Sequence, residues 1–321
     1  MDDALIEERI AATLQEAYGH GVQIQECNEV PGVGTARKVH KLSIATPAGD
    51  NLKLFAKTGT DSQVRIEAAL YQSAFGSDFS VVPRFVAATE DDGVHCVIME
   101  EVVGEPVDAS NQDHVVAAFR ALAELHRLGR PHVGALIDAI HGPTTKVAHY
   151  TNPRDMFDRI FMIWGLATAF GITRDDLAIF YDQRVLDLVL KEVWTFVHGD
   201  FGPNNLLIDP DTLDVRFIDF GFGEVRATSS DLMYEFNYGS TFGDHLHAGL
   251  RAYWEASDQG VSFETFRIRQ AYWHASYYAD VYSWKLRKEH LEDEDYCRGQ
   301  AAWLECIRTG GRYIAEHIAA S

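Results

Sequence analysis

The chain has 321 residues, 46% of them hydrophobic, which is enough for one large domain or two ordinary domains with a substantial core. Its 28 basic and 48 acidic residues give a formal net charge of −20. This charge argues against a general nucleic-acid or anionic-membrane surface and is compatible with a cationic ligand, although a solvated acidic exterior is the simpler explanation of the charge alone.

The N-terminal residues predict a helix and no targeting segment. Residues 1–8 are acidic where a signal peptide is basic, and the apolar residues of 5–18 recur at the spacing of one helix face. The most apolar run, residues 161–172, is too short to span a bilayer. The four cysteines are scattered without a C-x-x-C pair, which favours neither a zinc site nor a disulfide framework. We therefore expect a cytoplasmic protein with no membrane or nucleic-acid partner.

Two strands, residues 22–27 and 38–46, are predicted from their alternating pattern, with a glycine-bearing tip between them. At such a tip, Gly32 and Gly34 allow backbone N–H groups to approach phosphates closely, and Thr35 adds a hydroxyl donor. A Pro-Gly turn that merely joins two strands explains the same residues, and the tip lacks a full G-x-G-x-x-G. Phosphate binding here therefore depends on finding the rest of a nucleotide site.

A third strand is predicted over residues 51–57, which alternate in polarity and end at Lys57. A helix is predicted over residues 63–75, with the Asp-Ser pair at 61–62 as candidate N-cap. Glu67 lies on this helix, one strand–helix connection away from the lysine.

Further strands are predicted at residues 81–85 and 96–99, with an Asp-Asp-Gly turn at 91–93 between them. Glycine and proline then break the pattern within residues 100–106, and the chain becomes helical from residue 113 to 128.

The middle of the chain predicts an inserted helical subdomain. Residues 154–170 and 175–196 are expected to be helical and to help wall a substrate cleft. His126, in the preceding helix, is expected to be a packed histidine and not a ligand.

The most informative stretch is HGDFGPNNLLI at residues 198–208, followed by VRFIDFG at residues 215–221. Their apolar residues predict a hairpin that brings Asn205 and Asp219 to the same end. An amide and a carboxylate suit Mg²⁺ beside phosphates, and Asp200 suits the proton of an attacking hydroxyl. A capped turn explains a lone H-x-D, but it does not explain the second carboxylate.

The pattern H-x-D, with an Asn five positions after the Asp and a later D-F-G, resembles the catalytic loop of the protein-kinase-like superfamily. The glycine in His198-Gly199-Asp200 resembles the aminoglycoside phosphotransferase and choline kinase branch, not the His-Arg-Asp of protein kinases. Residues 201–205 and the spacing from Asp231 to Glu235 look closer to hygromycin-type phosphotransferases. The resemblance is weak over the helical insert and the C-terminal third.

The resemblance implies a role for each polar residue of these segments. Asp200 would be the catalytic base, and Asn205 with Asp219 would hold Mg²⁺. Lys57 paired with Glu67 would bind the α- and β-phosphates of ATP, with GTP as the other compatible nucleotide. Lys53 shares a strand face with Lys57 and is the alternative candidate, but alternate lysines on a strand are usually solvated.

The resemblance also assigns a hinge and a supporting group. Residues 100–106 resemble the interlobe hinge, where adenine would meet Met99, the Glu100 carbonyl and the Val102 N–H; a simple domain linker explains the same residues. Asp231 would brace the catalytic loop from beneath, in the second shell together with His198.

The segment after Asp219 indicates a small acceptor, because it lacks the activation segment ending in Ala-Pro-Glu on which protein kinases bind peptides. Instead, a helix is expected over residues 229–235, with a serine at 229 or 230 as N-cap. Carboxylates among aromatic residues follow, and Glu235, Asp244 and Asp280 are candidates for binding a cationic acceptor. Core aromatics and solvated acids explain each position singly.

Together these features predict a bilobal α+β, protein-kinase-like fold. An N-terminal ATP-binding lobe, residues 1–102, would hold a five-stranded antiparallel sheet, and residues 103–321 would form the helical catalytic lobe. The first function hypothesis is an ATP- and Mg²⁺-dependent O-phosphotransferase that inactivates an aminoglycoside-type antibiotic, as a monomer or dimer. The alternatives are a kinase of choline, homoserine, methylthioribose or a sugar, and a catalytically silent nucleotide-binding protein.

Overall fold

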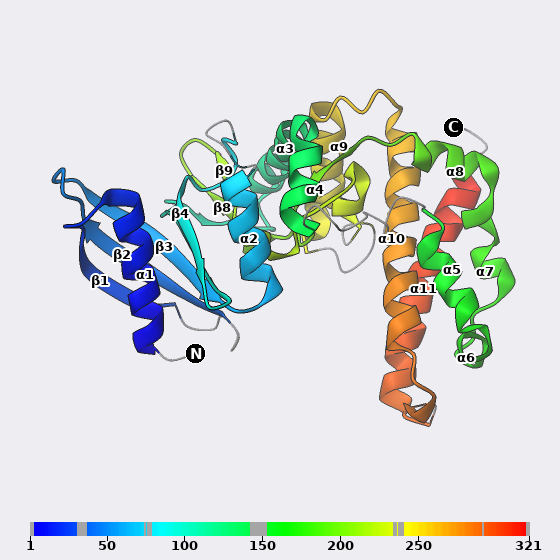
Figure 1. The fold of residues 1–321 in the computed structure, drawn as a ribbon. Coiled ribbons are helices and arrows are strands. Elements are labelled where there is room, and N and C mark those ends of the chain that lie inside the picture. Colours follow the sequence, from blue (N-terminus) through cyan, green and yellow to red (C-terminus); the bar gives the residue numbers. More distant parts are fainter. Residues whose placement is uncertain are drawn as a thin grey trace.

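The computed structural model of the chain describes residues 3–30, 37–73, 75, 79–141, 153–233, 236, 241–290 and 292–318. A sheet region formed by the N-terminal part of the chain lies beside a mainly helical C-terminal part (Figure 1). The predicted bilobal α+β architecture is confirmed. The glycine-bearing tip, with Gly32, Gly34 and Thr35, lies outside the described residues, and so does Glu235.

The N-terminal sheet has five antiparallel strands in the order β1-β2-β3-β5-β4. Their bounds are β1 Gln23–Glu29, β2 Arg37–Ala45, β3 Asn51–Gly59, β4 Phe85–Asp91 and β5 Val94–Glu100. Strands β4 and β5 are joined by the predicted turn, in which Asp92 and Gly93 both adopt positive φ angles of 52° and 73°. Two such residues match the twist of a tight hairpin, which explains the Asp-Gly pair.

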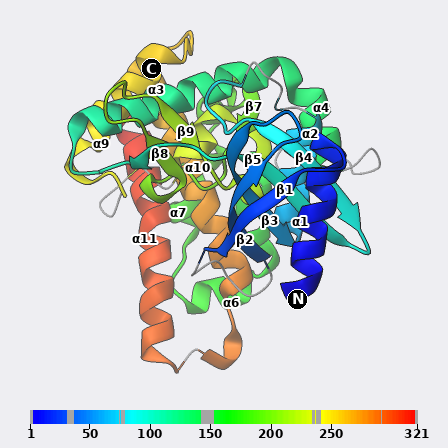
Figure 2. The same cartoon turned by 90° about the vertical axis from the view of Figure 1, so that its left-hand side faces the viewer.

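Helix α1 (Asp3–Tyr18) covers one face of this sheet, and helix α2 (Ser62–Ser73) lies on the other side. Ile6 and Ile10 of α1 pack with Leu54 and Ala56 of β3, and all four side chains are fully buried. Because side chains alternate along a strand, Lys57 emerges on the opposite face, toward α2. Figure 2 shows the sheet and α1 in front of the helical part.

The prediction of a strand at residues 81–85 is wrong. Val81 and Val82 form a turn with buried side chains, and β4 begins only at Phe85. Pro83 has no N–H with which to extend a ladder. The Val81 carbonyl instead accepts a hydrogen bond from the Phe217 N–H at 2.8 Å, which ties the sheet region to the helical part.

The helical part is built around long helices. They are α3 (Gln112–Gly129), α4 (Val133–His141), α9 (Leu246–Ala256), α10 (Phe263–Lys285) and α11 (Glu294–His317). Helices α10 and α11 pack side by side along most of their length (Figure 1). In the described residues, no helix is both long enough and apolar enough to cross a lipid bilayer.

The inserted helices are shorter than predicted. They are α5 (Asp155–Met162), α6 (Trp164–Ala169), α7 (Arg174–Ala178) and α8 (Gln183–Leu190), and they pack against α10 and α11. The helix expected to reach Phe196 ends at Leu190, because residues Trp194–Val197 form strand β7, which pairs with β10 (Glu224–Ala227). The aromatic and β-branched residues of β7 favour a strand once a partner is present.

The predicted hairpin, here called the catalytic hairpin after the motif that it carries, is confirmed as a structural element. Strands β8 (Leu206–Ile208) and β9 (Val215–Phe217) pair antiparallel, with the two-residue strand β6 (Glu105–Pro106) on the outer side of β8. The Ile218 N–H donates to the Asn205 carbonyl at 3.0 Å, so Asn205 and Asp219 lie at the same end of the hairpin.

Short 3₁₀ helices complete the fold, at Arg130–His132, Ile179–Tyr181, Pro203–Asn205, Phe220–Phe222, Thr228–Leu232, Gly243–His245 and Lys288–His290. The α-helix expected from residue 229 is therefore a 3₁₀ helix, η5 (Thr228–Leu232). Neither serine caps it: the Ser230 hydroxyl donates back to the Ala227 carbonyl at 2.7 Å, and the Ser229 N–H donates to Glu192.

Candidate active site

Strand β7 leads directly into the loop at residues 198–205, here called the catalytic loop. Gly199 has a φ angle of +79°, and a Cβ atom there would lie 2.1 Å from the Phe222 carbonyl oxygen. Only glycine fits this conformation and this close approach. The His-Gly-Asp form of the motif therefore follows from the way residues 220–223 pass against the loop.

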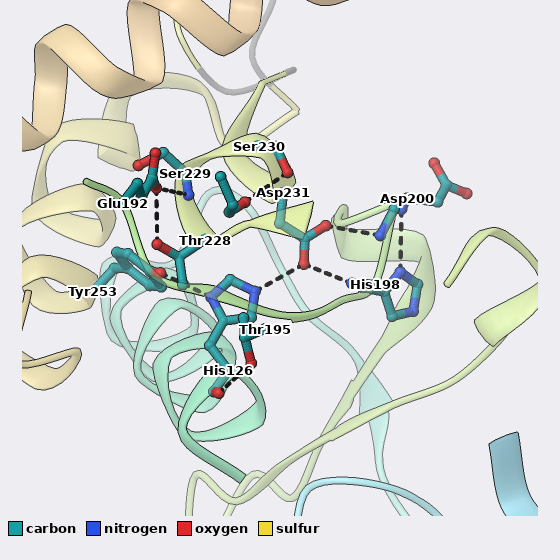
Figure 3. A network of polar contacts seen from close by, with 12 residues as sticks. His126, Glu192, Thr195, His198, Asp200, Thr228, Ser229, Ser230, Asp231 and Tyr253 are labelled. Carbon is teal, nitrogen blue, oxygen red and sulfur yellow. Dashed lines mark hydrogen bonds and ion pairs between the residues drawn. The ribbon is translucent and has the colours of Figure 1, made fainter. Parts of the chain in front are cut away.

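Asp231 holds the loop from beneath (Figure 3). Its carboxylate accepts hydrogen bonds from the His198 N–H at 2.7 Å and the Gly199 N–H at 2.8 Å. Asp231 is 1% exposed. Burial alone would raise the pKa of Asp231, but the hydrogen bond and charge of His126 and the contacts to His198 outweigh burial and lower it. The structure therefore places Asp231 against the backbone of residues 198 and 199, and its role in supporting catalysis stays a prediction.

Two buried side chains extend this support into the helical part. His126 Nε2 lies 3.1 Å from Asp231, and its Nδ1 lies 2.8 Å from the Tyr253 hydroxyl. His126 is thus the packed histidine that the sequence predicts. Glu192, which sequence reasoning missed, accepts from the Thr228 hydroxyl at 2.8 Å and from the Trp273 indole at 3.0 Å. Glu192 fixes η5, the element that carries Asp231.

His198 links the catalytic loop to the segment before Asp219. Its Nε2 lies 2.9 Å from the Ile218 carbonyl oxygen, which can only accept, so Nε2 carries the proton. Nδ1 is then the acceptor for the Asp200 N–H at 3.3 Å. A single tautomer therefore ties the backbone of Asp200 to Ile218, the residue before Asp219.

Asp200 is exposed, and its orientation is set by Asn205. The Asn205 Nδ2 group donates both to the Asp200 carbonyl and to its carboxylate, each at 2.8 Å. Because these acceptors require the NH₂ side of the amide, the Oδ1 atom of Asn205 faces away from Asp200 and is available to a cation.

Lys57 joins β3 to the second carboxylate of the motif. Its ammonium forms a buried ion pair with Glu67 of α2 and lies 2.9 Å from Asp219 Oδ1. Burial alone would lower the pKa of Lys57, but Glu67 and Asp219 outweigh burial and raise it, so the ammonium stays charged. Lys53, the alternative candidate, is exposed.

Arg37 is a second cation at this point. Its Nη2 atom lies 3.5 Å from Asp219 Oδ2. Burial would raise the pKa of Asp219, but Lys57 and then Arg37 outweigh burial and lower it. No sequence pattern singled out Arg37, which lies just after the glycine-bearing tip.

These groups lie at the polar end of a cavity of about 520 Å³, here called the interlobe cavity. Its walls are the sheet, with Phe55 and Met99, and the catalytic hairpin, with Leu207 and Ile218. The expected hinge residues Glu100 and Val102 also line it. An apolar slot with charged groups at one end suits a planar base that carries phosphates.

Two oxygen donors in this cavity fit a magnesium ion. Asn205 Oδ1 faces away from Asp200, and Asp219 presents a carboxylate kept ionised by its cationic neighbours. Mg²⁺ prefers carboxylate and carbonyl oxygens and usually completes its shell with water and substrate phosphates. Asn205 and Asp219 are therefore sufficient as the protein's part of such a site.

A second cavity of about 450 Å³, here called the loop-side cavity, includes Gly199 and Gly221 in its walls. It therefore adjoins the residues next to Asp200 and Asp219. Helix α10 supplies another wall, with Ser276, Tyr277 and Asp280. Of the candidate acceptor residues, Asp280 lies here, whereas Asp244 is exposed in its 3₁₀ turn and is not among the described residues that line either cavity.

Comparison with known proteins gives one family and one fold. Residues 51–269 match the model of the phosphotransferase enzyme family. No curated protein sequence matches the chain.

Solved structures with similar folds include the GDP complex of wild-type aminoglycoside 2′-phosphotransferase-IIIa, with 15% identity, a TM-score of 0.62, and coverage of 96% of this chain and 99% of that chain. The macrolide 2′-phosphotransferase of Brachybacterium faecium has 14% identity, a TM-score of 0.57 and coverage of 95% and 97%. The Plasmodium vivax ethanolamine kinase has 12% identity, a TM-score of 0.55 and coverage of 92% and 83%. The kinase-like fold class is thereby confirmed.

Proposed function

The chain belongs to the phosphotransferase enzyme family and is a small-molecule kinase, and on that basis we propose that it transfers the γ-phosphoryl group of ATP to a hydroxyl group of its acceptor. The observation that carries this proposal is the meeting of Lys57 and Asp219 with Asn205 at the polar end of the interlobe cavity. Asp200 lies beside them through its hydrogen bond to Asn205. Residues 1–102 would form the nucleotide-binding lobe and residues 103–321 the catalytic and acceptor-binding lobe.

The interlobe cavity orients the nucleotide. The base would lie among Phe55, Met99 and Leu207, which line this cavity, near the backbone of residues 100–102. Lys57 binds the α- and β-phosphates, and its ion pair with the buried Glu67 holds the ammonium in place. Lys57 therefore needs no further ordering when the nucleotide arrives.

Asn205 and Asp219 would hold Mg²⁺. The ion, when bound, neutralises the charge that develops on the transferred phosphoryl group. The residues of the chain fix its place: Asn205 is oriented by its bonds to Asp200, and Asp219 by Lys57 and Arg37.

Asp200 is the residue that acts on the acceptor. Its exposed carboxylate accepts the proton of the attacking hydroxyl as the new O–P bond forms. Asn205 on the carboxylate and Asp231 beneath the loop determine where Asp200 points. Phosphoryl transfer is mostly positioning, so this support contributes directly to the rate.

Two classes of acceptor remain from the sequence, a cationic aminoglycoside-type antibiotic and a hydroxylated metabolite. The structural neighbours named above act on aminoglycosides, macrolides or ethanolamine, and at 12–15% identity they identify the fold and not the acceptor. The charges of the loop-side cavity favour the metabolite class, because both carboxylates among its described wall residues already have an arginine partner.

ADP release from Mg·ATP tests the proposal, with aminoglycosides including hygromycin B compared against choline, homoserine, methylthioribose and sugars. We expect turnover of at least one acceptor by the wild-type protein and turnover about 10³-fold slower by Asp200→Ala. If the protein binds ATP but no acceptor raises its rate of ADP release above that of Asp200→Ala, the silent nucleotide-binding alternative holds.

A further inference from the structure

The loop-side cavity has the position of an acceptor site, and the inference below rests on the proposed function in that respect. Two glycines lie in its walls. Gly199 directly precedes Asp200 in the sequence, and Gly221 lies two positions after Asp219. The other walls come from α2, α4, α5, β10, η5 and α10, elements far apart in sequence. A molecule in this cavity would lie beside the catalytic loop and outside the interlobe cavity.

The two carboxylates among the described wall residues, Asp280 and Glu224, are already neutralised. Asp280 forms an ion pair with Arg159 of α5, and Glu224 forms an ion pair with Arg226 on the same strand, β10. An ammonium group that binds either carboxylate must compete with an arginine held at contact distance. The cavity therefore offers a polycation little uncompensated negative charge.

Arg65 of α2 makes the net charge of the described side chains at this cavity positive. It lines the cavity, and its Nη2 atom donates to the Ile140 carbonyl at 3.2 Å. Among the described residues, no carboxylate lies within ion-pair distance of Arg65. With Arg159, Arg226 and Arg65 against Glu224 and Asp280, this group of side chains carries one cation more than it has anions.

Ser276 provides a second, independent indication of a ligand. It lies in the cavity wall, is 2% exposed, and its Oγ atom has no hydrogen-bond partner among the described residues. A serine within a helix ordinarily donates to the carbonyl four residues earlier, and a buried hydroxyl without a partner lowers stability. A polar ligand in the cavity would supply the missing partner.

We propose that the loop-side cavity is the acceptor site and that the acceptor is a hydroxylated compound carrying a carboxylate or phosphate group, with the anionic group on Arg65 and a further polar group on the Ser276 hydroxyl. Arg65 and Ser276 are specificity-determining residues, not catalytic ones. The ion pairs Asp280–Arg159 and Glu224–Arg226 select against polycations.

Binding to two charge series tests the proposal directly. The first series is glucose, glucuronate, glucose 6-phosphate and glucosamine; the second is glycerol, glycerate, glycerol 3-phosphate and 3-amino-1,2-propanediol. Calorimetric titration of the full chain, with and without ADP, should show that in at least one series an anionic member binds most tightly, and comparison of carboxylate with phosphate identifies the preferred group. Tightest binding of the amines, or no anionic binding at millimolar concentration, would overturn the proposal.

Arg65→Gln should weaken the anionic members by about tenfold or more and leave the neutral members unchanged, as the loss of one charge-assisted hydrogen bond predicts. Arg120→Gln is the matched control, because Arg120 is an exposed arginine on α3 that lines neither cavity. Equal losses in the two variants would contradict a specific role for Arg65.

Ser276→Ala distinguishes a ligand contact from a structural role, because the two roles predict different changes in melting temperature and in acceptor binding. Removal of an unpartnered buried hydroxyl should leave the melting temperature of the free protein unchanged or higher, while acceptor binding weakens several-fold. A lower melting temperature together with unchanged binding would assign Ser276 to the fold. These titrations do not need turnover, so a failure of the proposed kinase reaction would appear separately, as absence of ADP release.

Discussion

The interlobe cavity and the loop-side cavity meet at the catalytic loop, yet their charges are arranged in opposite ways. In the interlobe cavity, one buried ammonium, Lys57, is shared by two carboxylates, Glu67 and Asp219. In the described part of the loop-side cavity, each carboxylate has an arginine of its own, and no described carboxylate lies within ion-pair distance of Arg65.

This difference shows two ways of preparing a site for an anion. Lys57 is fixed in advance by Glu67, so a nucleotide in the interlobe cavity would meet a charge of defined position. The loop-side cavity instead keeps its carboxylates occupied and leaves one cation over, which selects among acceptors without taking part in the chemistry. Substitutions on each side should therefore affect different measurements.

Asp200→Ala should have the largest effect. Loss of the base is expected to lower kcat by about 10³-fold, within the range typical of general-base removal. Because Asp200 belongs to neither ion-pair system, binding of Mg·ATP and of acceptor should change no more than a few-fold. Steady-state ADP release and separate titrations of both ligands measure the two effects.

Asp244→Ala is the matched control for this change, since Asp244 is an exposed carboxylate of the helical part. If it reduces kcat as strongly as Asp200→Ala, the loss reflects general charge and not the catalytic loop. Undiminished turnover by Asp200→Ala would remove Asp200 from the mechanism.

Lys57→Met should have the next largest effect, on the nucleotide side alone. Loss of a charged phosphate contact is expected to weaken ATP binding by about 10- to 100-fold. Because Glu67 is 1% exposed and would lose its cation, the free energy of unfolding should also fall by about 3 kcal/mol. Nucleotide titration and chemical denaturation measure these effects.

Lys53→Met supplies the comparison on the same strand. Lys53 is exposed, so we expect its replacement to leave ATP binding within twofold and stability within about 0.5 kcal/mol. Acceptor binding in the absence of nucleotide should be unaffected by either lysine variant; a loss there would mean that the two cavities are not separate.

The contrast between the cavities also explains what the sequence could reveal. The strand ending at Lys57, the helix carrying Glu67 and the hairpin between Asn205 and Asp219 each follow from local alternation, capping and turn signals. Their convergence is as the family resemblance implied, and their catalytic roles stay predictions.

The missed features depend on partners distant in sequence. Residues 194–197 read as a helix end because nothing nearby shows that β10 pairs with them. In the same way, Arg159 pairs with Asp280, which lies 121 positions later in the sequence. Nothing in the sequence distinguishes Ser276 from other helical serines, because its burial is visible only in the structure. An acidic sequence does not show which acids are already paired, so the cationic acceptor expected from the sequence and the anionic acceptor proposed from the loop-side cavity remain competing predictions.

Asp231→Asn should have an intermediate effect on both cavities, since Asp231 supports the loop between them. We expect a loss of about 3 kcal/mol in the free energy of unfolding near neutral pH, because the buried carboxylate accepts two backbone N–H groups. The pKa of Asp231 is lowered from its ordinary 3.8, so this advantage of the wild type is complete above that value and declines as pH falls below it.

Denaturation of both proteins between about pH 7 and about pH 3 measures this decline. Asp244→Asn, at an exposed position, should show no such pH-dependent difference. A constant gap between wild type and Asp231→Asn down to the lowest pH would contradict the lowered pKa.

Asp280→Asn should have the smallest effect and sharpens the comparison most. A partly exposed ion pair contributes at most about 1 kcal/mol to stability, so the protein should remain folded with little change. Removal of this carboxylate leaves Arg159 uncompensated, which should tighten binding of glucuronate or glycerate a few-fold relative to glucose or glycerol. The same change in Glu124, whose arginine partner lies on the surface of α3 away from both cavities, should not do so. If Asp280→Asn weakened anionic compounds and Glu124→Gln did not, Asp280 would be a direct acceptor contact, and its pairing with Arg159 could not be what excludes cations.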